Sequence, residues 1–407
     1  MSIYIDKGVL FVGGGILQSY AILIARSKGI KIYLIDGNRN CYCSNLADEF
    51  FKIDTKDHLK AAELAMKLKE DNKINGVYTQ GTDVAYTVAY AAQKSGLPHL
   101  TPSAAYSTEN KALMRKILYQ NGIDNTKFLV IENEKDLRES KNEIGFPLYV
   151  KPVDNSGSRG VSRVLNHSDL VKAYKNAKKN NIVHSSVILE EEIIGNEYSI
   201  DTIVYDGIVF NAGISDRIFR KKEKYAVQGG SITPSLLPSE KQNEMIELMS
   251  KIAKVFKINN SALKGDLIID ENNKVRVIEI AARTSGGFDS QVRKPASFGI
   301  DIISFTLDIS LGLIPQMRQL IPRWIKWSKT ISIFPQPGII KEIIGIDWLE
   351  RNKDIIDYKI LSKVGDALEN YTDCATRKNY VTFKADTFTK LKELEIKIKN
   401  KLKIVTF

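Results

Sequence analysis

The chain has 407 residues, of which 43% are hydrophobic and 26% charged, and this length and composition predict a globular protein of two or three domains. The N-terminus has no secretory signal pattern and no segment approaches about 18 consecutive apolar residues, so we expect a cytoplasmic protein without a membrane partner. The net charge of +11 comes from basic residues that alternate with acidic ones on expected helix faces, which argues against a nucleic-acid partner. The three cysteines form no CxxC pair and the four histidines are scattered, which argues against a zinc site and a Ser-His-Asp triad.

The first hundred residues alternate expected strands and helices. An apolar run at 8–12 leads through a glycine turn into a helix that ends at Gly29, and a second strand ends at Asp36. Helix and strand signals then follow at 57–72, 76–80 and 84–96. This order predicts right-handed βαβ units and a parallel sheet.

The glycine-rich turn at 13–15, followed by Asp36 at the end of the second strand, invites comparison with dinucleotide-binding sites. A GxGxxG motif that starts at Gly13 would, however, need glycine where the chain has Gln18. A nicotinamide site and a glycine turn kept for the sheet or for a substrate pocket both stay open on this evidence.

The rest of the chain predicts an α+β arrangement. Residues 110–145 have a helical pattern, and further helices are expected at 168–181, 239–257 and 387–402. Expected strands lie at 146–152, 161–165, 187–194, 198–207, 208–217, 329–336 and 380–385. Prolines near 315–323 indicate a domain boundary.

A hairpin at 265–280 brings two carboxylates together. If Asn272 and Asn273 form a two-residue turn, Asp266 and Glu279 are direct cross-strand neighbours, with Cβ atoms about 4.5–5.5 Å apart. Two such carboxylates repel unless a cation lies between them, and Mg²⁺ binds a few carboxylates together with nucleotide phosphates. The pair therefore predicts a magnesium site, with unrelated surface acids as the alternative.

Arg283 follows shortly after Glu279, and Gly286 and Gly287 come next. A guanidinium beside a metal pair suits a phosphoryl oxygen or a carboxylate, and glycines can offer main-chain N–H donors. A capped turn after a strand is the alternative interpretation.

Two further segments carry chemistry. Lys151 ends an apolar strand, and the following loop at 155–160 has glycines and serines that can wrap a polyphosphate, or it forms an ordinary flexible hairpin. In the acidic segment 188–199, Glu190 and Glu192 share a strand face and Glu191 lies opposite. Such acids can accept hydrogen bonds from an adenine amino group and ribose hydroxyls, or they form a solvated edge.

Together and in this order, the segments 110–123, 146–161, 188–201 and 265–287 resemble the ATP-grasp superfamily, closest in pattern to its amino-acid-ligase and carboxylase-like (carbamoyl-phosphate-synthase-like) branch. The resemblance implies a combined α/β and α+β fold. It implies a Rossmann-like pre-ATP-grasp domain at 1–105, an ATP-grasp domain at 106–318 with a mobile lid at about 120–190, and an α+β lobe at 319–407.

The resemblance also assigns roles by position. Lys111 and Lys151 would contact the nucleotide phosphates, under a mobile flap that includes Ser156, Gly157, Ser158 and Gly160. Glu190 would take the adenine amino group, and the other adenosine contacts would come from Glu191, the Ile193 main chain and Glu197. Asp266 and Glu279 would hold the metal, and Arg283 and Lys151 would be catalytic. Substrate contacts would come from Arg217, Gln228, Ser231, Arg283, Gly286 and Gly287.

The implied activity is an ATP-dependent carboxylate–amine ligase that works through an acyl phosphate on an amino acid or a similar small carboxylate. ATP with Mg²⁺, or Mn²⁺ in its place, would be the cofactors, and a homodimer is expected. A carboxylase-type enzyme that activates bicarbonate and a catalytically silent ATP-binding regulator are the alternatives. Many members have asparagine two residues after the metal glutamate, where this chain has Ala281, so a second metal ion would lack one protein ligand.

Overall fold

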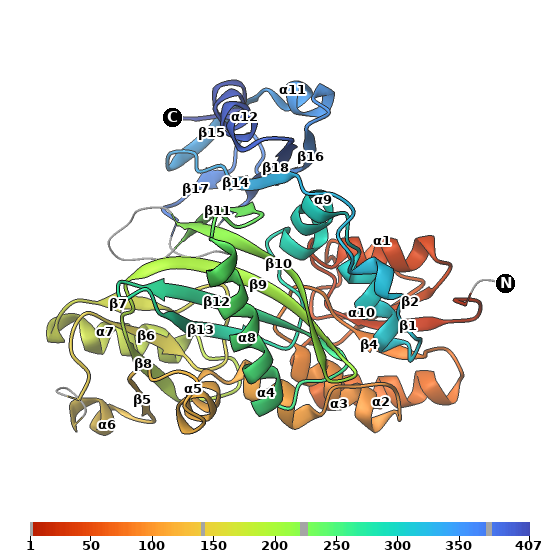
Figure 1. The fold of residues 1–407 in the computed structure, drawn as a ribbon, viewed down its shortest axis with the longest axis horizontal. Helices are drawn as coiled ribbons and strands as arrows, with labels where there is room; N and C mark the ends of the chain where they lie inside the picture. The colour runs from red at the N-terminus through yellow and green to blue at the C-terminus, as the bar shows by residue number, and fades with distance from the viewer. Residues whose placement is uncertain (1–2, 140–142, 220–226, 372–376) are drawn as a thin grey trace.

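The computed structural model describes residues 3–139, 143–219, 227–371 and 377–407 (Figure 1). The N-terminal part is the predicted parallel sheet, with strand order β3-β2-β1-β4. Its strands are β1 (Gly8–Val12), β2 (Lys31–Asp36), β3 (Glu49–Lys52) and β4 (Gly76–Tyr78), and its helices are α1 (Ser19–Ser27), α2 (His58–Glu70), α3 (Ala85–Lys94) and α4 (Pro102–Glu109). The strand β3 was not predicted, because it is short and only partly buried and so shows no long apolar run.

A second, antiparallel sheet with the order β5-β8-β6-β7 occupies the lower left of Figure 1. It consists of β5 (Phe128–Ile131), β6 (Leu148–Pro152), β7 (Ser162–Val164) and β8 (Val187–Glu191), with α6 (Glu134–Glu139) and α7 (His167–Lys179). Residues 110–145 are therefore not helical throughout, because β5 lies between α5 (Lys111–Gln120) and α6. This sheet and α7 share their own cluster of buried side chains, which includes Leu148, Tyr174 and Leu189.

The central sheet has eight strands in the order β13-β12-β9-β10-β11-β14-β18-β16. Five come from the middle of the chain: β9 (Gly195–Tyr205), β10 (Ile208–Phe219), β11 (Gln228–Thr233), β12 (Ser261–Asp270) and β13 (Val275–Ala281). The other three, β14 (Trp327–Ser332), β16 (Ile355–Ile360) and β18 (Asn379–Ala385), come from the C-terminal region, which therefore continues this sheet. The same region holds a small sheet of β15 (Gly338–Ile344), β17 (Ala367–Leu368) and β19 (Lys403–Thr406), with α11 (Ile346–Arg351) and α12 (Phe388–Lys401).

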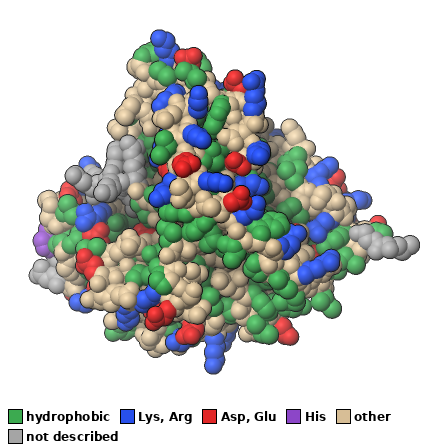
Figure 2. Space-filling view, turned by 45° about the horizontal axis from the view of Figure 1, so that its top comes forward, with side chains coloured by type: hydrophobic (Ala, Val, Ile, Leu, Met, Phe, Trp, Pro, Cys, Tyr) green, Lys and Arg blue, Asp and Glu red, His purple; other side chains and the backbone are tan. Residues whose placement is uncertain are grey.

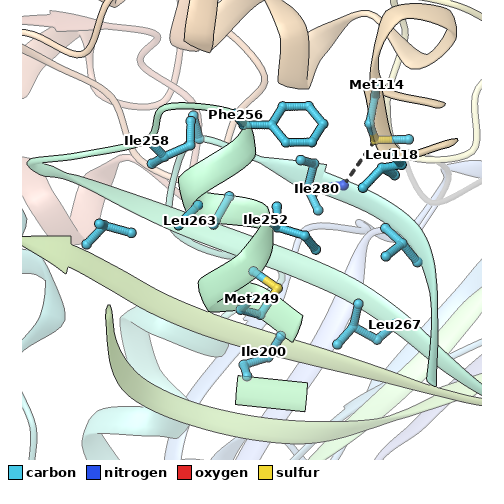
Figure 3. Close-up of a cluster of buried hydrophobic side chains, with 14 of the residues drawn as sticks. Met114, Leu118, Ile200, Met249, Ile252, Phe256, Ile258, Leu263, Leu267 and Ile280 are labelled. Carbon is cyan, nitrogen blue, oxygen red and sulfur yellow. Dashed lines mark hydrogen bonds between the residues drawn. The ribbon is translucent and has the colours of Figure 1, made fainter. Parts of the chain in front are cut away.

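The main core lies between the central sheet and the helix α8 (Ser239–Val255) (Figure 3). Met249 and Ile252 on α8 pack with Ile200, Leu263 and Leu267 of the sheet, all completely buried. On the other side of β13, α5 joins the same core through Met114, whose sulfur accepts from Ile280 N at 3.4 Å. This packing fixes α5, which carries two basic residues of the candidate site, against the strand that carries Glu279.

The surface carries charged side chains of both signs. On the face shown in Figure 2, basic and acidic side chains lie among one another over most of the surface. Among the described residues, no helix is both long enough and apolar enough to cross a bilayer.

Candidate active site

The two carboxylates that were predicted to face each other across the hairpin do so, since Asp266 on β12 pairs directly with Glu279 on β13. The predicted turn is wrong, however. Asp270 N donates to Lys274 O, so the loop has three residues, 271–273, instead of two. A β-bulge between this loop and the carboxylates, where Ile278 is the extra residue on β13, restores the predicted register at Asp266.

Basic side chains from three elements balance this carboxylate pair. Lys111 Nζ lies 2.6 Å from Glu279, while Lys264 Nζ and Arg217 Nη1 lie 2.6 and 3.3 Å from Asp266. Burial alone would raise the pKa of Asp266, but Arg217 and Lys264 outweigh it and hold that pKa below its usual value. Asp266 is therefore ionised at neutral pH although it is almost completely buried.

The pair fits a magnesium ion that is shared with nucleotide phosphates. Asp266 Oδ1 is buried and accepts no hydrogen bond from any described residue, although a buried carboxylate oxygen normally has a partner. The described part of the chain contains no cluster of three or more His, Cys, Asp or Glu side chains, so a metal here would have few protein ligands. Mg²⁺ is commonly bound in this way, through one or two carboxylates plus phosphates and water. Ala281 is buried and offers no side-chain ligand, which leaves a second ion without that protein contact.

Glu190 lies at the centre of a buried ion-pair network. It is 2% exposed, and its two oxygens accept from Arg115 Nε at 2.8 Å and from Lys151 Nζ at 2.5 Å. Its predicted contact with the adenine amino group is therefore not favoured by this geometry, because both oxygens already have charged partners. Lys151 does lie where it was predicted, near the end of β6, and it is partly buried with Glu190 as its anionic partner.

Arg115 is a structural residue to which sequence reasoning assigned no role. Its guanidinium is 2% exposed and also donates to the carbonyl oxygens of Val277 and Ile278. It therefore stabilises the bulge that sets the register of the hairpin with Asp266 and Glu279. The burial of an arginine cannot be recognised from one sequence. The available indication was that Arg115 follows Lys111 by one helical turn, which puts both residues on the same face of α5.

The Glu190 network predicts a specific sensitivity to acid. Burial would raise the pKa of Glu190, but Arg115 and Lys151 outweigh it and lower that pKa from an ordinary 4.5 to about 2. A depressed carboxyl pKa stabilises the fold above the ordinary value, and this contribution is lost as the pH falls from about 4.5 towards 2. We expect the urea unfolding midpoint to fall more steeply across this window in the wild type than in Glu190→Gln, and equal slopes would contradict the network.

The predicted phosphate loop connects β6 with β7 and is next to Lys111. Lys111 Nζ donates to Asn155 O at 2.7 Å, and Gly157, Ser158 and Gly160 all have positive φ angles, between 63° and 74°. A Cβ on Gly160 would come within 2.5 Å of the Asn180 side chain, so glycine is required there. Ser156 Oγ accepts from Arg159, which folds the loop back on itself. Closure of this loop over a ligand stays a prediction.

The other two acidic residues predicted to contact adenosine, Glu191 and Glu197, lie at the end of β8 and in β9. Glu191 accepts from Lys127 N at 2.9 Å and Glu197 pairs with Arg217 at 2.8 Å, while Ile193 is half-buried between them in the sequence. Burial raises the pKa of Glu197, partly offset by Arg217. Since Arg217 contacts both Glu197 and Asp266, the predicted ribose residue and the metal pair belong to one cluster.

Arg283 has a partner that sequence reasoning missed. Its Nε donates to Asp83 Oδ1 at 2.8 Å, and burial, which would raise the pKa of Asp83, is outweighed by Arg283 and Lys111. Asp83 lies in the loop after β4, a parallel strand. Loops at the carboxyl ends of parallel strands often carry functional groups, so its position could have indicated Asp83 from the sequence. Gly286 lies against Gly81 of the same loop, and Gly287 borders open space.

The other predicted substrate residues also come together. Arg217 on β10 pairs in register with Ser231 on β11, and Gln228 Nε2 donates to Ser231 Oγ at 2.7 Å. They lie at the end of β10 that carries the contacts of Arg217 with Glu197 and Asp266.

The glycine-rich turn has structural partners of its own. Gly14 N donates to Asp36 at 2.8 Å, and a Cβ on Gly14 would come within 2.6 Å of Cys41 Sγ. Gln18, which replaces the third glycine of the fingerprint, donates to the main chain of Gln80 instead. Side chains of the chain itself therefore occupy the space around the turn, which favours the structural interpretation over a nicotinamide site.

A cavity of about 670 Å³ adjoins the cluster on the side of α3. Residues 282–284 form one edge, and its walls are mostly apolar, with Val88, Leu97 and Ile309 among them. Because phosphates need cationic partners, the charged cluster suits them better than this cavity does.

Comparison with known proteins gives the type of domain and the fold. Residues 144–291 match the family model described as the ATP-grasp domain. The structure of an L-amino acid ligase from Bacillus licheniformis superposes with a TM-score of 0.84 at 19% identity and covers 98% of this chain and 99% of that one. Residues 144–291 therefore match an ATP-grasp domain, and the chain has the fold of this ligase, as its motifs predict.

Among curated proteins, the chain is 24% identical over 345 residues to the L-arginine-specific L-amino acid ligase of Bacillus subtilis, which covers 81% of each chain. It is 21% identical over 334 residues to carnosine synthase 1 of Gallus gallus, over 76% of this chain. The chain spans 36% of the length of that synthase and about half the length of several other curated relatives.

Proposed function

We propose that this protein is an ATP-dependent ligase that joins the carboxylate of an amino acid to an amine and releases ADP and phosphate. The observation that carries the proposal is the cluster around Asp266 and Glu279, where Lys111, Lys264 and Arg217 surround two carboxylates that are suited to Mg²⁺. The relatives named as amino acid ligases support an amino acid as the carboxylate substrate.

The basic residues would change partners when the nucleotide binds. In the structure Lys151 pairs with Glu190 and Lys111 with Glu279, and phosphate oxygens would share these cations. Bound Mg²⁺, held by Asp266 and Glu279, would neutralise phosphate charge during transfer. Arg283, oriented by Asp83, would hold the substrate carboxylate near the γ-phosphoryl group.

The proposed reaction has two displacements. A carboxylate oxygen bonds to the γ-phosphorus while the bond to ADP breaks, and the amine nitrogen then bonds to the acyl carbon, releases phosphate and loses a proton. Neither step needs a nucleophile from the protein. This agrees with the state of Cys41 and Cys43, which are buried, and burial raises the pKa of the Cys43 thiol to about 12. Cys374 lies outside the described residues.

The test is release of ADP and phosphate from the purified chain with Mg-ATP and the twenty common L-amino acids, singly and in pairs, with and without bicarbonate. We expect release that requires an amino acid, together with an amide product in the mass spectrum. Release that requires bicarbonate would favour a carboxylase. Tight ATP binding without release under any of these conditions would favour a regulatory protein.

A further inference from the structure

Gln291 is a buried amide without a visible partner. It lies in the short π-helical segment Asp289–Arg293 after the Ser285–Gly287 turn and is 7% exposed. Neither its Nε2 nor its Oε1 forms a hydrogen bond with any described residue. Burying both ends of a carboxamide without partners is costly, so such a group needs an explanation.

Other buried glutamines in the same region are satisfied. Gln80 is completely buried, and its Nε2 donates to Ser290 Oγ at 3.1 Å. Gln18 is 5% exposed and donates to Gln80 O. The fold therefore supplies partners for buried amides next to this turn, and Gln291 is the exception among these three.

The position of Gln291 connects it to the candidate active site. Its Nε2 and the Cα of Gly286 lie 3.0 and 3.1 Å from the point that a Cβ on Gly81 would occupy. The amide is thus next to glycines from two loops, the one that carries Asp83 and the one that follows Arg283. A Cβ on Gly287 would meet no atom within 4 Å, so the turn that precedes Gln291 borders open space at Gly287.

We propose that Gln291 binds the polar head of the amino acid substrate, and this inference rests on the proposed ligase function. A carboxamide offers an acceptor and two donors, which match the ammonium and carboxylate groups of an α-amino acid. A site built to pair such groups discriminates strongly against analogues that lack them. Gln291 would therefore select amino acids over simple carboxylic acids.

The test compares Gln291→Leu with Gln80→Leu. Because Gln291 gives up no hydrogen bond in the folded chain, we expect Gln291→Leu to keep the wild-type melting temperature or exceed it, whereas Gln80→Leu lowers it. In the same Gln291→Leu protein, we expect the KM for the amino acid to rise at least about tenfold while the KM for ATP stays within about twofold. The preference for the amino acid over its des-amino analogue should fall in parallel.

Two results would overturn the inference: a melting temperature of Gln291→Leu as low as that of Gln80→Leu, or an unchanged KM for the amino acid. If the wild type releases no ADP with any amino acid, the ligase proposal fails separately. Binding of the twenty L-amino acids, measured by calorimetry with Mg-ADP present, then decides the role of Gln291. Binding that Gln291→Leu loses supports that role, and binding that it keeps, or no binding by the wild type, rejects it.

Discussion

Glu279→Gln is expected to lower the rate of ADP formation by about 10²–10³-fold while the protein stays folded, because the amide cannot replace a carboxylate that faces both Lys111 and the proposed metal ion. The rate is measured by a coupled ADP assay at saturating Mg-ATP, and folding by circular dichroism. Raising the Mg²⁺ concentration should restore part of the activity if weaker metal binding causes the loss.

Glu271→Gln is a matched control for this variant. Glu271 lies in the loop of the same hairpin and is exposed, so the substitution removes the same charge from the same segment without touching the site. We expect it to have wild-type turnover. Wild-type turnover in Glu279→Gln as well would remove Glu279 from the metal site.

Arg115→Met is expected to lower the free energy of unfolding by about 3–5 kcal/mol, because it leaves Glu190 buried beside Lys151 alone and removes the support of the β13 bulge. Urea unfolding followed by fluorescence measures this difference. The double variant Arg115→Met/Glu190→Leu should regain part of the stability, because it removes the carboxylate that Arg115→Met leaves with Lys151 alone. Asp124 also loses Arg115, at 3.5 Å, but keeps Arg276 at 3.2 Å.

Arg26→Met provides the comparison for an exposed ion pair. Arg26 and Asp48 lie 3.8 Å apart with about half of each side chain exposed, so we expect a loss within about 0.5 kcal/mol. A loss in Arg115→Met no larger than this would show that the Glu190 network does not stabilise the fold.

Only part of the hairpin with Asp266 and Glu279 could be predicted from its sequence. Cross-strand pairing of Asp266 with Glu279 was predicted from the sequence, but with the wrong turn. The alternation of apolar and polar residues cannot reveal a bulge, which depends on the Arg115 contacts to Val277 and Ile278 from a distant helix. The prediction held at the site because the longer loop and the bulge shift the register in opposite directions.

Tertiary contacts explain the other differences. Glu190 was predicted to face a ligand because three consecutive glutamates are unusual in a buried strand, yet the charges that satisfy it come from α5 and β6. Gln18 was interpreted only as a break in a glycine fingerprint, whereas it donates to Gln80 O, and the Gln80 side chain in turn donates to Ser285 O. Strand β5 was missed because its flanking helices have a stronger pattern than its four residues.

The most direct test of the proposed chemistry is to follow ¹⁸O from the carboxylate of the amino acid substrate. If an acyl phosphate forms, the carboxylate oxygen that attacks the γ-phosphorus stays with the phosphate when the amine displaces it. We therefore predict one ¹⁸O atom in each phosphate released, detected by mass spectrometry or by the ³¹P isotope shift. Unlabelled phosphate released together with ADP and an amide product would contradict activation of the carboxylate by phosphoryl transfer.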